Sequence, residues 1–347
     1  MNNETRPLTS VAGFRALAAS PGTATSIGSL PHIDPHAAAE FVLEHHPVLP
    51  AIPSLPRRSP FESLVAQAAV GIPGVHIEAD GSLQINTRRM DPVAPITTDL
   101  SDEAYGAMRG FLEVARGRTE PVKWQACGPI TLGFELVRAG APSNIAFDVA
   151  TRAVRVRLRA LHRAVAEALP GAEQIVFVDE PALVHLMHPC FPVPPDVAID
   201  LVSGVLAGIE LSAAAGVHCC GDSDPAALTA IGPRILSLPV SRRLVDAAGY
   251  LTEFLAHGGW IAWGVVPTDR PLAGSPERYW NDLAGLWCEL VQRGADPVLL
   301  RTQALLTPVC GLAMHDLEQA ALVLSHTAAI AEKVAEQAVA TRLSIGA

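Results

Sequence analysis

The segment QIVFVDEPAL, residues 174–183, decides the fold class of this chain. Four apolar residues, 175–178, follow one another without polar alternation, and the acidic pair Asp179-Glu180 and a proline end the run. A continuous run of β-branched and aromatic residues is typical of a parallel strand that is buried on both faces. The segment therefore predicts a parallel sheet covered by helices.

Seven further runs of this kind occur along the chain, and helical patterns separate them. The predicted strands cover residues 23–28, 48–54, 122–127, 174–179, 216–220, 234–240, 260–266 and 297–306. The predicted helices cover residues 35–44, 60–69, 102–117, 145–168, 197–213, 225–230, 242–256, 276–293 and 314–340. Asp34-Pro35 and Asp224-Pro225 mark helix starts, because an N-cap residue before proline is a start signal. This repeated alternation predicts an α/β fold, a (β/α)8 TIM barrel, with a doubly wound open sheet as the competing fold.

Residues 71–95 interrupt the repeat because they are too many for a simple connection. Residues 75–79 and 82–86 flank Asp80-Gly81, a pattern typical of a β-hairpin with a type I′ turn. We therefore expect a β-hairpin insertion after strand 2 of the barrel. The whole chain, residues 1–347, is expected to form a single barrel domain with its core at about residues 23–340.

Composition and charge exclude several classes of function. The chain has 347 residues, 49% of them hydrophobic, which is ample for a large core. Its formal net charge of −10 disfavours nucleic acid as a partner. No apolar run is long enough to span a membrane, and residues 1–20 do not resemble a secretory signal. Six cysteines without such a signal predict reduced thiols and a cytoplasmic protein, with its oligomeric state left open.

Thiol and imidazole side chains occur where predicted strands end, which is the position of the active site in TIM barrels. His218 and Cys220 are two residues apart, so an extended backbone places both side chains on one face. Cys310 follows the last strand, and barrel closure can bring it to the same mouth. One His and two Cys suit zinc, and three protein ligands leave the open position of a catalytic site. The alternative is a buried histidine with inert, apolar cysteines.

Two other groups of polar residues have a functional and a structural interpretation. Asp179 and Glu180 can hold the ammonium group of a substrate, or they can cap a helix or pair with an arginine. His185, His188 and Cys190 also have metal-like spacing, but they lie on a proline-bounded loop that positions ligands less firmly than a strand end does.

Five segments resemble the catalytic half of cobalamin-independent methionine synthase. This family belongs to the barrel superfamily that includes uroporphyrinogen decarboxylase and zinc methyltransferases acting on thiols. The segments are SIGSLP at 26–31, GPIT at 128–131, VDEPAL at 178–183, VHCC at 217–220 and PVCGL at 308–312. They follow the order of the family and cover most of the chain, from about residue 23 to residue 315.

The resemblance implies a zinc ion as cofactor and an amino acid as methyl acceptor. Its implied zinc ligands are His218, Cys220 and Cys310. Four residues are implied to bind the acceptor, namely Ile27, Gly28 and Ser29 at the carboxylate and Asp179 at the ammonium. In this interpretation the catalytic residues are the three zinc ligands and Asp179, and Glu180 is a further candidate for substrate binding.

Three positions depart from the pattern of the family. Leu238-Pro239-Val240 replaces the glutamate that serves as the fourth zinc ligand. Residues 56–59, Pro-Arg-Arg-Ser, replace the acidic segment that contributes a second ammonium-binding glutamate. Residues 266–269 contain no counterpart of a histidine linked to proton handling.

The sequence therefore predicts a zinc-dependent methyltransferase that acts on a small thiol, homocysteine or an analogue, as in methionine biosynthesis. The methyl donor stays open between a methylated corrinoid and folate. One alternative is a zinc-dependent thiol transferase that adds a thiol to an electrophile such as an epoxide. Another is a degenerate barrel that binds a small thiol or a partner without catalysis.

Overall fold

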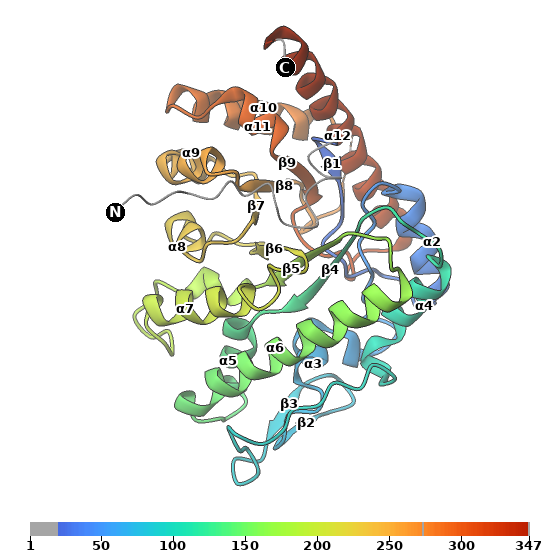
Figure 1. Ribbon diagram of the computed structural model, residues 1–347, viewed down its shortest axis with the longest axis vertical. Helices are drawn as coiled ribbons and strands as arrows, with labels where there is room; N and C mark the ends of the chain where they lie inside the picture. Colours follow the sequence, from blue (N-terminus) through green and yellow to red (C-terminus); the bar gives the residue numbers. More distant parts are fainter. Residues whose placement is uncertain (1–19, 273, 346–347) are drawn as a thin grey trace.

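The structure is a computed structural model that describes residues 20–272 and 274–345. A seven-stranded parallel sheet curls through its centre, in the order β1-β9-β8-β7-β6-β5-β4, and helices surround it (Figure 1). The strands are β1 Thr23–Ala24, β4 Val122–Cys127, β5 Gln174–Asp179, β6 Ala214–His218, β7 Ile235–Pro239, β8 Trp260–Val266 and β9 Ala304–Pro308. This confirms the α/β class and the parallel sheet.

Residues 50–54 hydrogen-bond on two sides, to the edge strand β4 and to residues 28–30, which follow the other edge strand, β1. The Ile52 N–H donates to the Lys123 carbonyl oxygen of β4 at 2.8 Å. On the other side, the Leu30 N–H donates to the Ser54 carbonyl oxygen at 3.0 Å. Both contacts have parallel geometry. In the described residues, the predicted strand at 48–54 is therefore present only as a bridging segment with isolated bridges beside the seven-stranded sheet.

Helices pack around the outside of the sheet. They are α2 Pro35–His45, α3 Leu64–Ala69, α4 Gly106–Val114, α5 Pro129–Arg138, α6 Ser143–Ala168, α7 Pro195–Leu206, α8 Pro225–Ala230, α9 Ala248–Ala256, α10 Glu277–Gln292, α11 Pro297–Thr302 and α12 Leu317–Ile345. Short 3-10 helices are η2 Pro60–Glu62, η3 Glu103–Tyr105, η4 Pro181–His185 and η5 Arg242–Val245. In the described part of the chain, none of the helices is both long and apolar enough to cross a membrane.

The predicted strand over residues 297–306 is wrong in its first half, where the chain forms helix α11. Asp296 caps this helix, because its carboxylate accepts a hydrogen bond from the Val298 N–H at 2.7 Å, and Pro297 opens the first turn. Asp-Pro is thus the same start signal as at Asp34-Pro35 and Asp224-Pro225. Helix α5, which follows Gly128, was not predicted at all.

The predicted hairpin is confirmed in its pairing, but its predicted turn is wrong. Strand β2, Val75–Ile77, pairs antiparallel with β3, Leu83–Ile85. A type I′ turn needs positive φ at both central residues. Gly81 has a φ of 84°, whereas none of the non-glycine residues in the described ranges has a positive φ, so Asp80 does not qualify. Its carboxylate instead accepts from the Ser82 N–H at 2.9 Å, which stabilises a longer loop.

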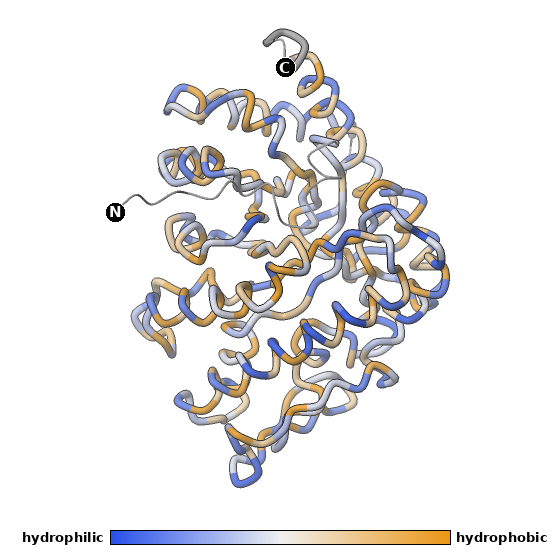
Figure 2. The backbone as a smooth tube through the Cα atoms, in the orientation of Figure 1, coloured by the Kyte–Doolittle hydropathy of each residue, from blue (hydrophilic) through white to orange (hydrophobic). Residues whose placement is uncertain are grey.

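The core divides between the two faces of the sheet because strand side chains alternate. One set packs between the sheet and the helices and forms the large core. The other set forms a small apolar cluster inside the curl, made of Leu49, Ile175, Phe177, Ala214, Ile235, Trp260, Ala262 and Leu305. The tube in Figure 2 shows hydrophobic residues along the central strands, whereas the surrounding helices alternate between hydrophobic and hydrophilic residues. Polar side chains that point inward therefore stand out at the strand ends.

Two expectations concern residues that lie outside the described ranges. The expected domain of residues 1–347 includes residues 1–19 and 346–347, which lie outside them. The expected lack of a secretory signal concerns residues 1–20, of which only Ser20 is described.

Candidate active site

Three polar side chains stand in one row at the carboxyl ends of β5, β6 and β7. Asp179 is the register partner of His218, and His218 is the register partner of Ser237. All three residues are buried. The sequence indicated Asp179 and His218 but not Ser237, although a lone hydroxyl within the apolar strand Ile-Leu-Ser-Leu-Pro was a usable signal.

The structure brings the three predicted metal ligands together at this rim. His218, Cys220 and Cys310 each offer one donor atom, and these atoms all lie within 4.8 Å of one another. Cys310 reaches the cluster from beyond β9 because the sheet curls back on itself. Cys219, between the first two, is fully buried and belongs to the large core on the helix side. Neighbouring residues of an extended chain thus point to opposite faces.

The environment of His218 fits a metal-binding histidine. Its Nδ1 hydrogen-bonds with the Ser237 hydroxyl at 2.9 Å, and its buried Nε2 has no hydrogen-bond partner among the described residues. A buried polar atom without a partner costs free energy. Histidine ligands of metals commonly use one ring nitrogen for the metal and the other for an orienting partner. The donor set of one imidazole and two thiols therefore fits zinc.

The thiols of Cys220 and Cys310 influence each other strongly. Their hydrogen bond lowers the pKa of Cys310 and raises the pKa of Cys220. The nearby ring of His218 lowers the pKa of Cys310 further, although burial opposes this shift. One of the two thiols therefore loses its proton easily. Cysteine binds metals as the thiolate, so the pair is suited to that task.

Asp179 offers a free carboxylate oxygen at the same rim. It is 6% exposed, and its Oδ1 has no hydrogen-bond partner in the described ranges. Burial raises the pKa of Asp179 to about 6, while the nearby His218 and Lys123 act in the opposite direction. A buried carboxylate with an unpaired oxygen suits a cationic or N–H donor group of a ligand.

A cavity of about 240 Å³ connects these residues. Its lining includes Ile27, Ser29, Asp179, His218, Cys220 and Cys310. The candidate metal ligands and most of the candidate acceptor-binding residues therefore face one space of small-molecule size. Two residues that the sequence analysis did not single out, Gln125 and Glu62, also line it.

Two glycines permit the close packing around this cavity. Gly28 has a φ of 136°, and a Cβ atom there would lie 2.2 Å from Nε2 of Gln125. A Cβ atom on Gly311 would lie 1.9 Å from Oγ of Ser29. Any larger residue at either position would push a lining side chain out of place. Gly28 therefore contributes through its backbone and its lack of a side chain.

Glu180 points away from the cavity. Its fully buried carboxylate accepts hydrogen bonds from the Ile130 N–H at 2.9 Å, the Thr131 N–H at 2.7 Å and the Thr131 hydroxyl at 2.7 Å. Burial raises the pKa of Glu180 to about 7, and these hydrogen bonds oppose the shift. The carboxylate therefore caps the start of α5, which is the structural role considered above for the acidic pair. A Cβ atom on Gly128 would lie 2.1 Å from Oε1 of Glu180, so this position also needs glycine.

Glu62 brings a second carboxylate to the cavity, a few residues beyond the basic segment at 56–59. Both of its oxygens are already engaged. Oε2 accepts from the Leu55 N–H at 2.7 Å, and Oε1 accepts from Arg58 at 2.7 Å and from the Ala107 N–H at 3.0 Å. Glu62 therefore stabilises the wall of the cavity, whereas Asp179 retains a free oxygen.

The loop residues with metal-like spacing do not form a second metal cluster. Throughout the described ranges, the only group of three donors close enough to hold a metal ion is the one at His218. On the loop, the ring of His188 accepts from the Cys190 N–H at 3.2 Å, and His185 stacks on Phe134 with ring centroids 6.2 Å apart. These contacts are those of a packed loop.

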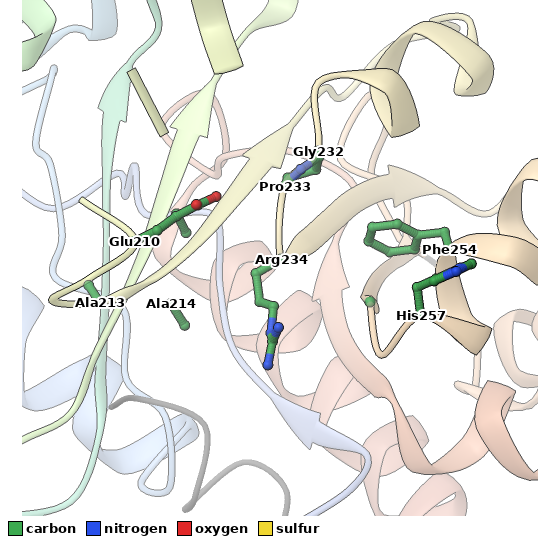
Figure 3. Close-up of a pocket in the computed structure, with 10 residues that line it drawn as sticks. Glu210, Ala213, Ala214, Gly232, Pro233, Arg234, Phe254 and His257 are labelled. Atoms are coloured by element: carbon green, nitrogen blue, oxygen red, sulfur yellow. The ribbon is translucent and has the colours of Figure 1, made fainter. Parts of the chain in front are cut away.

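A second cavity, of about 270 Å³, opens at the opposite ends of the strands. It is bounded by residues that precede or begin β6, β7 and β8. Figure 3 shows Arg234 between Glu210 on one side and Phe254 and His257 on the other. The ring of His257 is tied to the Glu253 carbonyl oxygen at 2.8 Å. The described residues around this cavity include no cluster of metal ligands, and they lie away from the strand ends where His218 stands.

The Ser237 hydroxyl gives a first testable prediction. Ser237→Ala removes the partner that orients the ring of His218, so zinc affinity should fall by about 10- to 100-fold, as is typical for outer-shell partners of metal ligands. Competition against a chelator of known affinity measures this loss. Thr327→Val, which removes another buried hydroxyl in α12, should leave zinc affinity unchanged. Equal affinities for wild type and Ser237→Ala would contradict the orienting role.

Comparisons with known proteins support the fold. No protein-family model and no curated protein matches the chain in sequence. A B12-independent methionine synthase from Shewanella sp. W3-18-1, in complex with selenomethionine, has a TM-score of 0.62 at 15% identity. That match covers 92% of this chain and 100% of the other. A putative vitamin-B12 independent methionine synthase from Listeria monocytogenes has a TM-score of 0.57 at 14% identity and covers 93% and 98%. This chain therefore shares the fold of these structures.

Proposed function

We propose that this protein is a zinc-dependent methyltransferase that transfers a methyl group to a small thiol, homocysteine or an analogue. One observation carries the proposal: three metal-ligand candidates, His218, Cys220 and Cys310, face the same cavity as Asp179 and Ser29. The shared fold with methionine synthases supports it. The Shewanella structure is a complex with selenomethionine, an amino acid whose side chain carries a methylated selenium atom.

We also propose that residues 48–54 serve as the eighth strand and close a (β/α)8 barrel. The hydrogen bonds of Ile52 and Leu30 on opposite sides of this segment support the closure. In this architecture the β2–β3 hairpin is an insertion after the second strand, and the chain is a single domain. We further place the protein in the cytoplasm, because all six of its cysteines are free thiols.

In the proposed site, His218, Cys220 and Cys310 would hold the zinc ion, and Ser237 orients His218 through their hydrogen bond. Zinc, when bound, lowers the pKa of a coordinated thiol, which is ~8.5 in its free form, so that the thiol is deprotonated at neutral pH. Leu238 and Pro239, at the end of β7, offer no further side-chain donor. Three protein ligands leave one coordination position open to the sulfur of an acceptor.

The remaining polar groups of the cavity bind the acceptor in this proposal. Asp179 accepts a charge-assisted hydrogen bond from the ammonium through its free oxygen, which also compensates the cost of burying that carboxylate. The Ser29 hydroxyl and the backbone at Gly28 face the acceptor carboxylate. Glu62, whose oxygens are engaged by Arg58 and two backbone N–H groups, keeps the wall in place.

Product analysis of the zinc-loaded protein tests this function. We expect L-homocysteine to be converted to methionine, detected by mass spectrometry, with either methylcobalamin or a methylated folate as donor. Chelation of zinc should abolish the product, and re-addition should restore it. Formation of a thioether from a thiol and an epoxide, without any methyl transfer, would favour the thiol transferase instead. Failure of every donor would favour a binding protein.

A further inference from the structure

Lys123 is buried inside the curled sheet, next to the small apolar cluster described above. The chain contains only two lysines, and this one is 0% exposed. Its Nζ lies 4.7 Å from the centroid of the Phe177 ring, a member of the apolar cluster inside the curl. Burial lowers the pKa of Lys123 to about 8, and the nearby Asp179 opposes this shift. A buried charge costs free energy unless it is well paired.

The ammonium group of Lys123 binds two groups that line or support the candidate acceptor site. It donates one hydrogen bond to the Ile27 carbonyl oxygen and another to Oε1 of Gln125 at 2.9 Å. Gln125 in turn donates through Nε2 to the Ile52 carbonyl oxygen at 3.0 Å. Lys123 thus links the segment that follows β1, the bridging segment at 50–54 and β4.

Lys123 itself does not line the cavity, but Ile27 and Gln125 do. The amide of Gln125 occupies the space where a side chain on Gly28 would lie, so the positions of these two residues depend on each other. The backbone around Gly28 is held from the other side as well, because the Ser54 N–H donates to the Gly28 carbonyl oxygen at 3.2 Å. A shift of Gln125 would therefore be transmitted to the Gly28–Ser29 turn.

We propose that Lys123 is a positioning residue for the acceptor pocket. Its ammonium group fixes the Ile27 carbonyl and the Gln125 amide, and these fix the Gly28–Ser29 turn that faces the acceptor. If residue 123 only filled space inside the sheet, an apolar side chain like those of the neighbouring cluster would be sufficient. The effect on the acceptor rests on the proposed function, whereas the effect on the turn is a property of the free protein.

The variant Lys123→Met keeps the length of the side chain and removes both hydrogen bonds. In the ligand-free protein we expect amide hydrogen exchange to rise about 10-fold or more at Leu30 and Ser54, whose N–H groups bond across this turn. Exchange in β8 should not change. Lys333→Met is the matched control, because it removes the other lysine, whose Nζ pairs with Glu277 on the surface at 2.5 Å.

Calorimetric titration of the zinc-loaded protein with L-homocysteine tests the link to the acceptor. Lys123→Met should raise its dissociation constant by about 10- to 100-fold at unchanged zinc content. Gln125→Leu should also weaken binding, and the loss in the double variant should be smaller than the sum of the two single losses, because both substitutions remove the hydrogen bond between Lys123 and Gln125. Additive losses would overturn the proposed relay through Gln125.

The outcomes for Lys123 and for the proposed function are separable. Unchanged exchange at Leu30 and Ser54 in Lys123→Met would overturn the positioning role, whatever the protein binds. Faster exchange confined to this turn, in a protein whose wild type binds no homocysteine, would support the positioning role and remove the proposed acceptor. If Lys123→Met does not fold, the same exchange measurement on Gln125→Leu decides, with faster exchange at Leu30 and Ser54 expected and unchanged exchange contradicting the role.

Discussion

Replacing Cys310 by serine should remove most of the zinc from the protein and abolish methyl transfer. The hydroxyl of serine is a poor zinc ligand at neutral pH, and the site then retains only His218 and Cys220. The loss of zinc affinity should exceed the roughly 10- to 100-fold typical of outer-shell partners, because a direct ligand is lost. Zinc per chain, measured after dialysis against a weak chelator, gives the result.

Cys219→Ser is the matched control for this experiment. Cys219 lies in the same strand-end segment but is fully buried on the helix side of the sheet. The substitution should leave zinc content near that of the wild type, although a buried hydroxyl can cost some stability. Equal loss of zinc in the two variants would contradict the assignment of faces. Full zinc content in Cys310→Ser would remove Cys310 from the ligand set.

Asp179→Asn should raise the KM for homocysteine strongly while leaving zinc content unchanged. The substitution keeps the shape of the side chain but removes the charge that would pair with the acceptor ammonium. Loss of one partner of a buried, hydrogen-bonded charge pair costs about 2–5 kcal/mol, which corresponds to a rise of roughly 30- to 5,000-fold. Steady-state kinetics with varied homocysteine measures it. A parallel loss of zinc would indicate that Asp179 supports the metal ligands instead.

A competition between homocysteine and a mercaptoacid of similar length separates the role of the ammonium from that of the thiol. If Asp179 holds the ammonium, wild type should prefer homocysteine, and Asp179→Asn should lose that preference. Glu62 does not provide a substitute, because both of its oxygens are engaged. Preference of the wild type for the mercaptoacid would exclude homocysteine as the natural acceptor and leave a different thiol.

The sequence predicted the sheet well where strands are long and buried on both faces. The bounds of β4, β5 and β8 match the predicted ones, because the strands end at clear signals: Gly128-Pro129 after β4, Asp179 in β5 and Pro267 after β8. The prediction is wrong after Asp296-Pro297, where a short apolar helix, α11, and the following strand, β9, form one continuous apolar run. Periodicity alone does not separate such short apolar runs.

The sequence predicts only those site residues that lie at or just beyond the ends of strands. His218 and Cys220 share a face by simple alternation, and the curl of the sheet adds Cys310. The contacts of Lys123 with Ile27 and of Glu62 with Ala107 were not predictable, because they join residues 96 and 45 positions apart in the sequence. The spacing of residues along the chain gives no information about contacts between segments so far apart.

Zinc-edge X-ray absorption with and without a thiol acceptor tests the central claim most directly. In the proposed site, an acceptor sulfur would take the zinc coordination position that His218, Cys220 and Cys310 leave open. Without acceptor, the zinc-loaded protein should show two sulfur neighbours at about 2.3 Å, and addition of homocysteine should raise that number to three. A sulfur count that stays at two with saturating homocysteine would contradict the account.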